Sequence, residues 1–357
     1  MRYKLLVINP GSTTTKIAIY DDATQVHIRN IDHSKNSLEK YDDVLNQQAF
    51  RAEMISEALR DWDIVPATLS AIVGRGNLLP GMKGGGYLVE ENMVTALREG
   101  KASPHASNLG ALLAYSIARP LGIPAYIYDS VTADEYDEIA KITGIPGVER
   151  ESMCHVLNVK AVSREFAMRM GKQYEDLNLI VVHMGGGITV SIHHKGRIID
   201  SIRDDSGPFS PERAGSIPLL YVIDMCYSGQ YTKKEMIRFI RGGGGLKSYL
   251  GTSDCREIEK MIEGGNEQAK KLYVAQAYQI AKGIGEMAPV LNGDIDYIVL
   301  TGGIAYSDMM TGMVEDRVKF IAPVERMPGE NEMEALAFGA IRLLNGEKYH
   351  IYGKEDS

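Results

Sequence analysis

The chain has 357 residues, of which 44% are apolar and 24% are charged, with a formal net charge of −8. This composition excludes a disordered or fibrous protein, and the acidic balance without a Lys/Arg-rich block argues against nucleic-acid binding. One hydrophobic core rarely supports this length, so we expect two lobes. Three cysteines without C-x-x-C spacing argue against a disulfide framework or a zinc site. This cysteine usage fits a reducing cytoplasm best. No apolar run approaches the roughly 18 residues of a membrane span, so we expect no membrane contact.

Two similar strand–turn–strand patterns lie far apart in the chain. Residues 5–8 and 16–20 flank a polar turn, and residues 179–183 and 188–193 flank a glycine-rich turn. Because each pattern opens a stretch of mixed helix and strand, the repeat indicates two lobes of related architecture rather than a solenoid.

The other segments alternate between helix and strand, which is typical of an α/β protein. We predict helices at 41–62, 107–121, 132–143, from 307 and at 332–344, and strands at 71–73, 125–129 and 295–300. We place the lobe boundary near residues 149–154. Residues 1–150 would then form the first lobe, joined by a C-terminal helix at 335–357, and residues 151–334 the second.

Three turns rich in glycine or small hydroxyl residues each follow an apolar strand. They lie at residues 9–16, 183–187 and 301–305. Backbone N–H groups and short hydroxyls that converge in a tight turn bind phosphate, because several oriented dipoles neutralise an anion without a bulky side chain intervening. The first turn lacks the G-x-x-x-x-G-K-[ST] order of a P-loop. Each turn alone is more often structural, but the three together predict a nucleotide site.

In this order, the turns resemble the acetate and sugar kinase/Hsp70/actin superfamily, and specifically its acetate/butyrate kinase family. Within the family, the opening at 8–13, the Gly74-Arg75-Gly76 loop and residues 205–213 resemble butyrate kinases most closely. The resemblance covers nearly the whole chain. It implies a two-lobed actin-like ATPase fold of duplicated ribonuclease H-like domains, with the active site in the cleft between the lobes.

The resemblance also implies roles for individual residues. ATP or ADP would be bound by Asn9, Gly11, Ser12, Thr13, Thr14, Lys16, His183, Gly185, Gly186, Gly187, Gly302, Gly303 and Ile304. Asp129 and Glu332 match the carboxylates that the family associates with Mg²⁺, and two acidic groups plus phosphates suit that cation. Read without the family, each is as readily a helix cap or a helix N-terminal acid.

Arg75 and His155 match positions near the acyl phosphate, where a cation and a hydrogen-bond donor stabilise charge on the transferred group. With His183 and Asp129 they form the expected catalytic set. Arg213 is the nearest candidate for a second family arginine, which does not align cleanly, and His105 is a further candidate.

Three residues depart from the acetate kinase pattern where the acid would bind. Gly76 and Asn77 replace bulky aliphatic residues, and Cys154 replaces a phenylalanine. Lost side-chain volume leaves room for a longer acyl chain, at about 0.8 kcal/mol per buried CH₂. This favours butyrate or a branched analogue over acetate.

The implied reaction is direct in-line phosphoryl transfer from ATP to a short-chain fatty acid, which is already a carboxylate at pH 7 and needs no base. One alternative is another carboxylate, such as acetate, propionate or isobutyrate. Another is a sugar kinase of the same fold, with Asp129 as general base. An ATP-driven binding module would need an extra domain, which is not apparent. We expect a homo-oligomer, because apolar helices are abundant.

Overall fold

The computed structural model describes residues 2–354, apart from the side chains of residues 35 and 36. The described chain divides into two compact units. Unit 1 comprises Met1–Asp134 and Asn331–Ser357 as far as they are described, and unit 2 is Glu135–Glu330. The C-terminal helix expected at 335–357 is wrong beyond Leu344, because Asn345 caps the helix, Gly346 has a φ of +102° and residues 350–351 form a strand. The last three residues of that prediction lie outside the described part.

The division falls between Asp134 and Glu135, rather than near residue 150, because the segment after Asp134 is hydrogen-bonded to unit 2. Glu135 Oε1 accepts from Lys160 Nζ at 2.6 Å, and its Oε2 accepts from the Ile198 N–H at 2.9 Å. Asp137 N–H donates to Ile199 O at 3.0 Å. Residues 135–150 are therefore part of unit 2.

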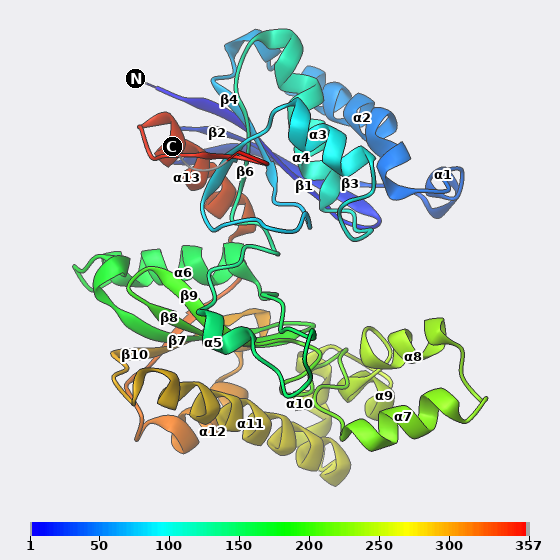
Figure 1. The fold of residues 1–357 in the computed structure, drawn as a ribbon, viewed down its shortest axis with the longest axis vertical. Helices are drawn as coiled ribbons and strands as arrows, with labels where there is room; N and C mark the ends of the chain where they lie inside the picture. The colour runs from blue at the N-terminus through cyan, green and yellow to red at the C-terminus, as the bar shows by residue number, and fades with distance from the viewer. Residues whose placement is uncertain (1, 355–357) are drawn as a thin grey trace. The chain divides into compact units, whose positions relative to one another are not determined.

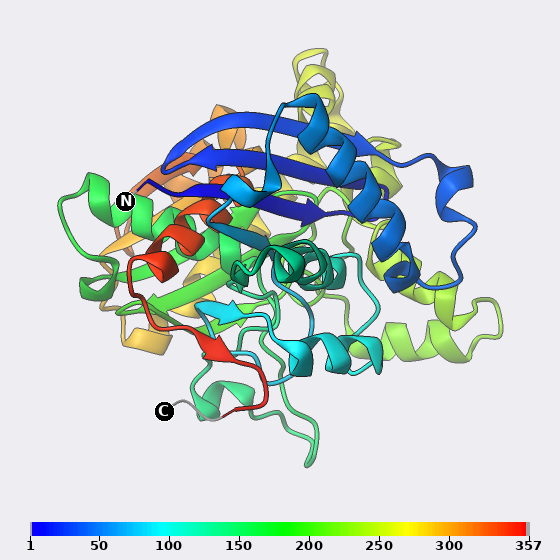
Figure 2. The ribbon, with the colours of Figure 1, turned by 90° about the horizontal axis from the view of Figure 1, so that it is seen from above.

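Unit 1 is built on a seven-stranded sheet of order β12-β5-β6-β4-β1-β2-β3. Its strands are β1 (Lys4–Pro10), β2 (Thr14–Asp21), β3 (Thr24–Asp32), β4 (Ala71–Arg75), β5 (Gly86–Leu88), β6 (Ala125–Tyr128) and β12 (His350–Ile351). The first three form an antiparallel meander, and Figure 2 shows them running side by side. β4 pairs in parallel with β1, and β6 in parallel with β4.

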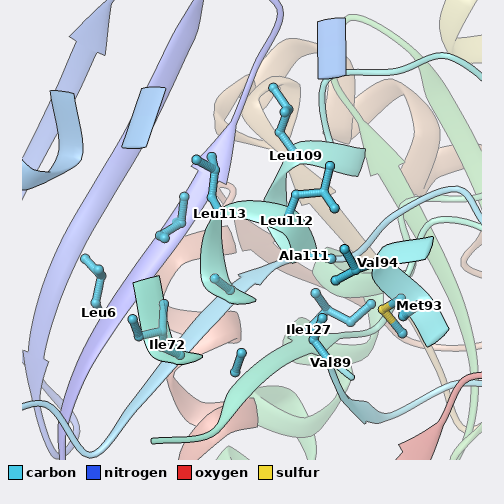
Figure 3. Packing of buried hydrophobic residues seen from close by; sticks show 14 of the residues in the cluster. Leu6, Ile72, Val89, Met93, Val94, Leu109, Ala111, Leu112, Leu113 and Ile127 are labelled. Atoms are coloured by element: carbon cyan, nitrogen blue, oxygen red, sulfur yellow. The ribbon is translucent and has the colours of Figure 1, made fainter. Parts of the chain in front are cut away.

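Helices cover both faces of this sheet. They are α1 (Lys35–Leu38), α2 (Gln48–Asp61), α3 (Glu91–Arg98), α4 (Asn108–Ala118) and α13 (Glu332–Leu344). α4 packs on β1, β4 and β6, with α2 and α3 against it, whereas α13 packs on the same strands from the other face (Figure 1). Leu6 and Ile72 of the sheet meet Leu112 and Leu113 of α4 in the buried cluster of Figure 3. Successive strand residues point to opposite faces, so one continuous apolar strand serves both layers.

Unit 2 repeats this plan around a five-stranded sheet of order β11-β10-β7-β8-β9. Its strands are β7 (Asn178–Met184), β8 (Ile188–His194), β9 (Arg197–Ile202), β10 (Tyr297–Gly302) and β11 (Val324–Pro328). Again an antiparallel meander, β7–β9, is extended from its first strand by a parallel strand, β10. The two strand–turn–strand patterns predicted from the sequence are confirmed as β1–β2 and β7–β8.

Only some of the helices of unit 2 pack on its sheet, and α7 and α8 project away from it (Figure 1). The helices are α5 (Glu138–Lys141), α6 (Val156–Arg169), α7 (Leu219–Tyr227), α8 (Lys233–Ile240), α9 (Gly245–Leu250), α10 (Cys255–Glu263), α11 (Glu267–Met287) and α12 (Asp308–Val318). α6 lies on one face of the sheet, and α11 and α12 lie on the other (Figure 1). Among residues 2–354, no helix combines the length and apolarity needed to cross a bilayer.

The helix predicted at 132–143 is wrong, because only the single turn α5 forms there. Backbone and side-chain hydrogen bonds to distant segments hold the first half of this stretch in turns. Thr132 Oγ1 donates to Leu79 O, and Asp134 N–H donates to Met82 O. These tertiary contacts override a helical pattern that the sequence carries only weakly.

Candidate active site

Three of the predicted site residues lie where parallel strands of unit 1 end. Asn9 is near the end of β1, Arg75 is the last residue of β4, and Asp129 directly follows β6. The parallel register pairs Ile8 with Gly74 and Arg75 with Tyr128. The three residues therefore lie along one edge of the sheet, which is where open α/β sheets bind their ligands.

Asn9, Arg75 and Glu332 form a hydrogen-bonded cluster at this edge. Glu332, the first residue of α13, accepts on Oε2 from Asn9 Nδ2 at 2.6 Å and from Arg75 Nη1 at 3.0 Å. Arg75 Nη1 also lies 3.3 Å from Asn9 Oδ1. Its side chain is 26% exposed and that of Glu332 23%, so the pair is accessible from one side. The guanidinium is thus held by two partners while part of it faces outward.

The side chain of Asp129 is almost completely buried. It is 2% exposed and has a φ of +44°. Its Oδ1 accepts from the Gly85 N–H at 2.9 Å, and its own N–H donates to Gly85 O at 3.0 Å. These bonds tie the end of β6 to the segment before β5 and fix the carboxylate at the strand edge.

A divalent cation fits this edge only if a substrate supplies further ligands. In the part of the chain that the structure describes, no three His, Cys, Asp or Glu side chains converge as a metal cluster. Mg²⁺ commonly uses one or two carboxylates with phosphate oxygens and water, so Asp129 and Glu332 at one edge suit it.

The turn between β1 and β2 has a conformation that its own contacts define. Gly11 N–H donates to Thr14 O at 2.8 Å, and a Cβ on Gly11 would lie 3.0 Å from Thr14 Oγ1. Ser12 and Thr13 are exposed at the tip. Lys16 is exposed on β2, directly opposite Asn9 in the ladder. Sequence reasoning missed Arg51, a buried residue of α2 that binds this turn from behind.

In unit 2, two imidazoles are stacked at the end of β7. The rings of His155 and His183 lie 3.8 Å apart with an interplanar angle of 18°. Nδ1 of His183 lies 3.1 Å from Asn158 Oδ1, and Nδ1 of His155 lies 3.1 Å from Thr189 Oγ1. Each ring is therefore anchored through Nδ1. The Nε2 of His183 lies 3.3 Å from Glu330 Oε1, so this nitrogen is directed at an acidic oxygen.

Carboxylates surround the glycine turn after His183. A Cβ on Gly185 would lie 3.2 Å from Glu330 Oε1, one on Gly186 3.3 Å from Glu212 Oε2, and one on Gly187 2.9 Å from Asp204 Oδ2. Larger residues would therefore press against these groups. Gly186 O is held by Ser210 Oγ at 2.6 Å and by the Glu212 N–H at 3.2 Å. The three glycines therefore let the turn lie close to these carboxylates.

Arginines balance these carboxylates. Arg213 Nε donates to Asp204 Oδ2 at 3.1 Å, and Arg241 Nη2 lies 2.6 Å from Asp205 Oδ2. Burial raises the pKa of Asp205, but the charges and hydrogen bonds of Arg203 and Arg241 outweigh it and hold that pKa below its usual value. Arg213 therefore belongs to an ion-pair network beside the glycine turn.

The two glycines of the third turn differ in the space around them. Gly302 has a φ of +87°, and a Cβ there would lie 2.4 Å from Met184 O, so only glycine fits. Gly303 has open space where a Cβ would stand. The side chain of Ile304 is 7% exposed and packs in the core of unit 2. The side chain of Ile304 therefore faces the core, and the predicted role of this turn in nucleotide binding would fall to its backbone.

The three residues that suggested a larger acid pocket are all packed closely in the structure. A Cβ on Gly76 would lie 2.4 Å from Ser130 Cα, so the backbone of Ser130 fills that volume. Asn77 is fully buried and donates to Met93 Sδ at 3.4 Å. Cys154 is 4% exposed and lies near Tyr136, whose pKa is raised by burial and then by this thiol. Gly76 therefore leaves no empty volume beside its own backbone, whereas the larger acyl pocket inferred from Asn77 and Cys154 stays a prediction.

His105 lies within the electrostatic range of Arg75. Burial and then the Arg75 charge lower the pKa of His105, and its Nδ1 lies 2.8 Å from Ser107 Oγ. The imidazole of His105 therefore lies near the Asn9–Arg75–Glu332 cluster.

Comparison with known proteins extends over almost the whole chain. Residues 144–322 match the model of the Acetokinase family. A protein of Clostridium botulinum (strain Alaska E43 / Type E3) named "Probable butyrate kinase" is 46% identical over 99% of this chain and 100% of its own length. "Butyrate kinase 1" of Clostridium acetobutylicum is 46% identical over 97% of this chain and 98% of its own.

Solved structures agree on the fold. An acetate kinase from Porphyromonas gingivalis superposes with a TM-score of 0.80 at 18% identity, covering 96% of this chain and 100% of its own. A propionate kinase from Francisella tularensis does so with a TM-score of 0.74 at 17% identity, covering 94% and 98%. The two-lobed actin-like ATPase fold predicted from the sequence is confirmed.

Proposed function

The chain belongs to the acetokinase family, and we propose that it transfers the γ-phosphoryl group of ATP reversibly to butyrate or a similar short-chain fatty acid. The observation that carries this proposal is the 46% identity to butyrate kinases along nearly the full length of both chains. The clusters at the carboxyl ends of β1, β4 and β7 supply residue types suited to the reaction.

The carboxylate of the acid attacks the γ-phosphorus directly, because it is ionised at pH 7 and needs no general base. What the protein must supply is alignment and neutralisation of charge on the transferred group. Arg75, His155 and His183 have those roles in the proposal, with Arg213 as a further cation. The proposal requires groups of both units to act on the same pair of substrates.

The nucleotide is held by main-chain groups. In the proposal, the turn from Asn9 to Lys16 and the turn from His183 to Gly187 bind the phosphates, and Gly302 and Gly303 accommodate the nucleoside. Asp129 and Glu332 would hold Mg²⁺, which would supply positive charge to neutralise the nucleotide phosphates. Glu332 then has two tasks, since it also holds Arg75 in place.

The sugar-kinase alternative is less well supported, because the relatives that match this chain at 46% identity over almost their full length are named butyrate kinases. A sugar kinase would also need a general base for the hydroxyl group, such as Asp129, whereas a carboxylate acceptor needs none.

Trapping of the acyl phosphate with hydroxylamine tests the proposal. The purified protein, ATP and Mg²⁺ are combined with each acid from acetate to hexanoate, and hydroxamate is measured. We expect most hydroxamate with butyrate or isobutyrate. No hydroxamate with any of these acids, or ADP release only with a sugar, would reject the function.

We further propose that the protein is a cytoplasmic homo-oligomer. The apolar residues of α7 support this assembly, because none of the helix is buried and Leu219, Leu220 and Tyr227 are each at least three-quarters exposed. Such a patch marks an interaction surface. Light scattering should give a dimer or larger for the native protein and a smaller species for Leu220→Lys.

A further inference from the structure

Arg51 is a fully buried arginine on α2, directly beneath the turn between β1 and β2. Its Nη1 donates to Gly11 O at 2.9 Å and to Thr14 O at 2.8 Å, and its Nη2 donates to Ser12 O at 3.1 Å. One guanidinium thus binds three carbonyls of a turn of four residues. The planar fork of arginine suits this task, and a lysine ammonium cannot reproduce it.

These hydrogen bonds from Arg51 determine the direction of the neighbouring amides. In a trans peptide the C=O and the following N–H point in opposite directions. Because Arg51 holds the carbonyls of Gly11 and Ser12 inward, the N–H groups of Ser12 and Thr13 point outward, where both residues are exposed. Neither N–H has an acceptor among residues 2–354. Successive outward N–H groups form a concavity that binds anions.

The charge of Arg51 has only neutral partners in the described chain. Besides the carbonyls, Nε and Nη2 donate to Gln47 Oε1 at 3.1 and 2.8 Å, and Nη1 donates to Thr15 Oγ1 at 3.0 Å. Burial lowers the pKa of Arg51 to about 10, so it stays charged at neutral pH. A buried charge without a counter-ion is costly, typically several kcal/mol.

The neighbouring side chains leave this charge without compensation. Thr15 Oγ1 lies 2.8 Å from His33 Nε2, and burial together with the Arg51 charge lowers the pKa of His33 to about 4. The imidazole is therefore neutral at pH 7 and adds no charge to the site. Arg51 is thus a costly buried cation that lies behind two outward-pointing amides. An anion bound in front of these amides would offset that cost.

We propose that Arg51 is a positioning residue of the phosphate site: it turns the Ser12 and Thr13 amides toward a nucleotide phosphate and supplies a buried positive charge behind them. The inference rests on the proposed function for the identity of the anion. Arg51 does not touch the substrate and acts through the turn.

Binding of ATP and of adenosine, each measured by calorimetry with Mg²⁺ and no carboxylic acid, separates the phosphate contribution from that of the nucleoside. Arg51→Gln removes the charge and the fork, and Arg51→Lys keeps the charge alone. Arg60→Gln is the matched control, because Arg60 is an exposed arginine of the same helix. Circular dichroism checks that each variant is folded.

We expect Arg51→Gln to weaken ATP binding at least 10-fold and Arg51→Lys to weaken it less, while adenosine binds all the folded proteins alike. The KM for ATP should rise without a matching rise in the KM for the acid. If Arg51→Gln does not fold, Arg51→Lys and Gln47→Leu, which removes one acceptor of the guanidinium, give the same comparison.

Unchanged ATP binding in the folded Arg51 variants, or an equal loss of ATP and adenosine binding, would overturn the inference. Hydroxamate formation by the native protein distinguishes this failure from that of the proposed function. If the native protein forms hydroxamate but ATP binding is unchanged in the Arg51 variants, only the role of Arg51 is rejected. An inactive native protein whose ATP binding depends on Arg51 rejects only the acid acceptor.

Discussion

The close contact between Gly110 in α4 and Arg75 in β4 predicts an unusual effect of adding one methyl group. A Cβ on Gly110 would lie 2.3 Å from Arg75 O and 2.9 Å from Arg75 N, and one on Gly74 would lie 2.2 Å from Gly110 O. These neighbours are backbone atoms, which cannot rotate away. Helix and strand therefore touch through two glycines, directly behind a proposed catalytic arginine.

Two effects of Gly110→Ala oppose each other. Alanine is more favourable than glycine within a helix by about 1 kcal/mol. Overpacking against a rigid neighbour costs about 1–3 kcal/mol, and a backbone clash belongs at the upper end of this range. We expect a net loss of about 2 kcal/mol in the free energy of unfolding, together with a lower kcat/KM because Arg75 is displaced.

Urea unfolding followed by circular dichroism measures the stability, with Gly312→Ala as the control. Gly312 is also inside a helix, α12, but nothing lies within 4 Å of its added Cβ. This variant should gain up to about 1 kcal/mol. The packing argument is refuted if both variants are stabilised alike.

Three further predictions concern anchoring, charge and acid stability. Asn158→Leu removes the acceptor of His183 Nδ1. The kcat should fall by more than 10-fold, about 1.4 kcal/mol, with little change in the KM for ATP. An equal loss of kcat in Asn158→Asp, which retains the acceptor, would contradict this prediction. Glu332→Gln should raise the Mg²⁺ concentration needed for half-maximal activity, and an unchanged Mg²⁺ dependence in a steady-state titration argues against metal binding there. Burial lowers the pKa of His193 to about 3, so the unfolded chain binds its proton first as the pH falls below about 6.5. This site should therefore lose about 2 kcal/mol of stability between pH 7 and 5, and His193→Gln should flatten that slope in urea titrations.

Local patterns predicted the parts of the fold that local interactions determine. The hairpins around residues 9–16 and 183–187 carry strands that are apolar on both faces and turns of small residues, so they were identifiable. Glu332–Leu344 has helical periodicity and forms α13 as predicted. The segment at 132–143 was not predictable, because its turns depend on hydrogen bonds to Leu79 and Met82.

Prediction of the site from the sequence is limited in the same way, because its residues depend on contacts between distant segments. Asn9, Arg75 and Glu332 come from motifs far apart in the chain, and only the resemblance to a family suggested that they belong together. Arg51 gave no signal, because an arginine in an amphipathic helix usually reads as a solvent-exposed residue. Gly76 was misinterpreted as missing volume, because the sequence does not show that the Ser130 backbone occupies that volume.

A crystal structure of the protein with ADP, Mg²⁺, butyrate and a planar analogue of the transferred phosphoryl group would show whether both units act on one nucleotide. We expect the Ser12 and Thr13 amides and the Gly185–Gly187 turn both to contact one nucleotide or the phosphoryl analogue, with Arg75 and His183 at the analogue. A complex in which the phosphates meet only one of these turns, or in which butyrate binds away from Arg75, would contradict it.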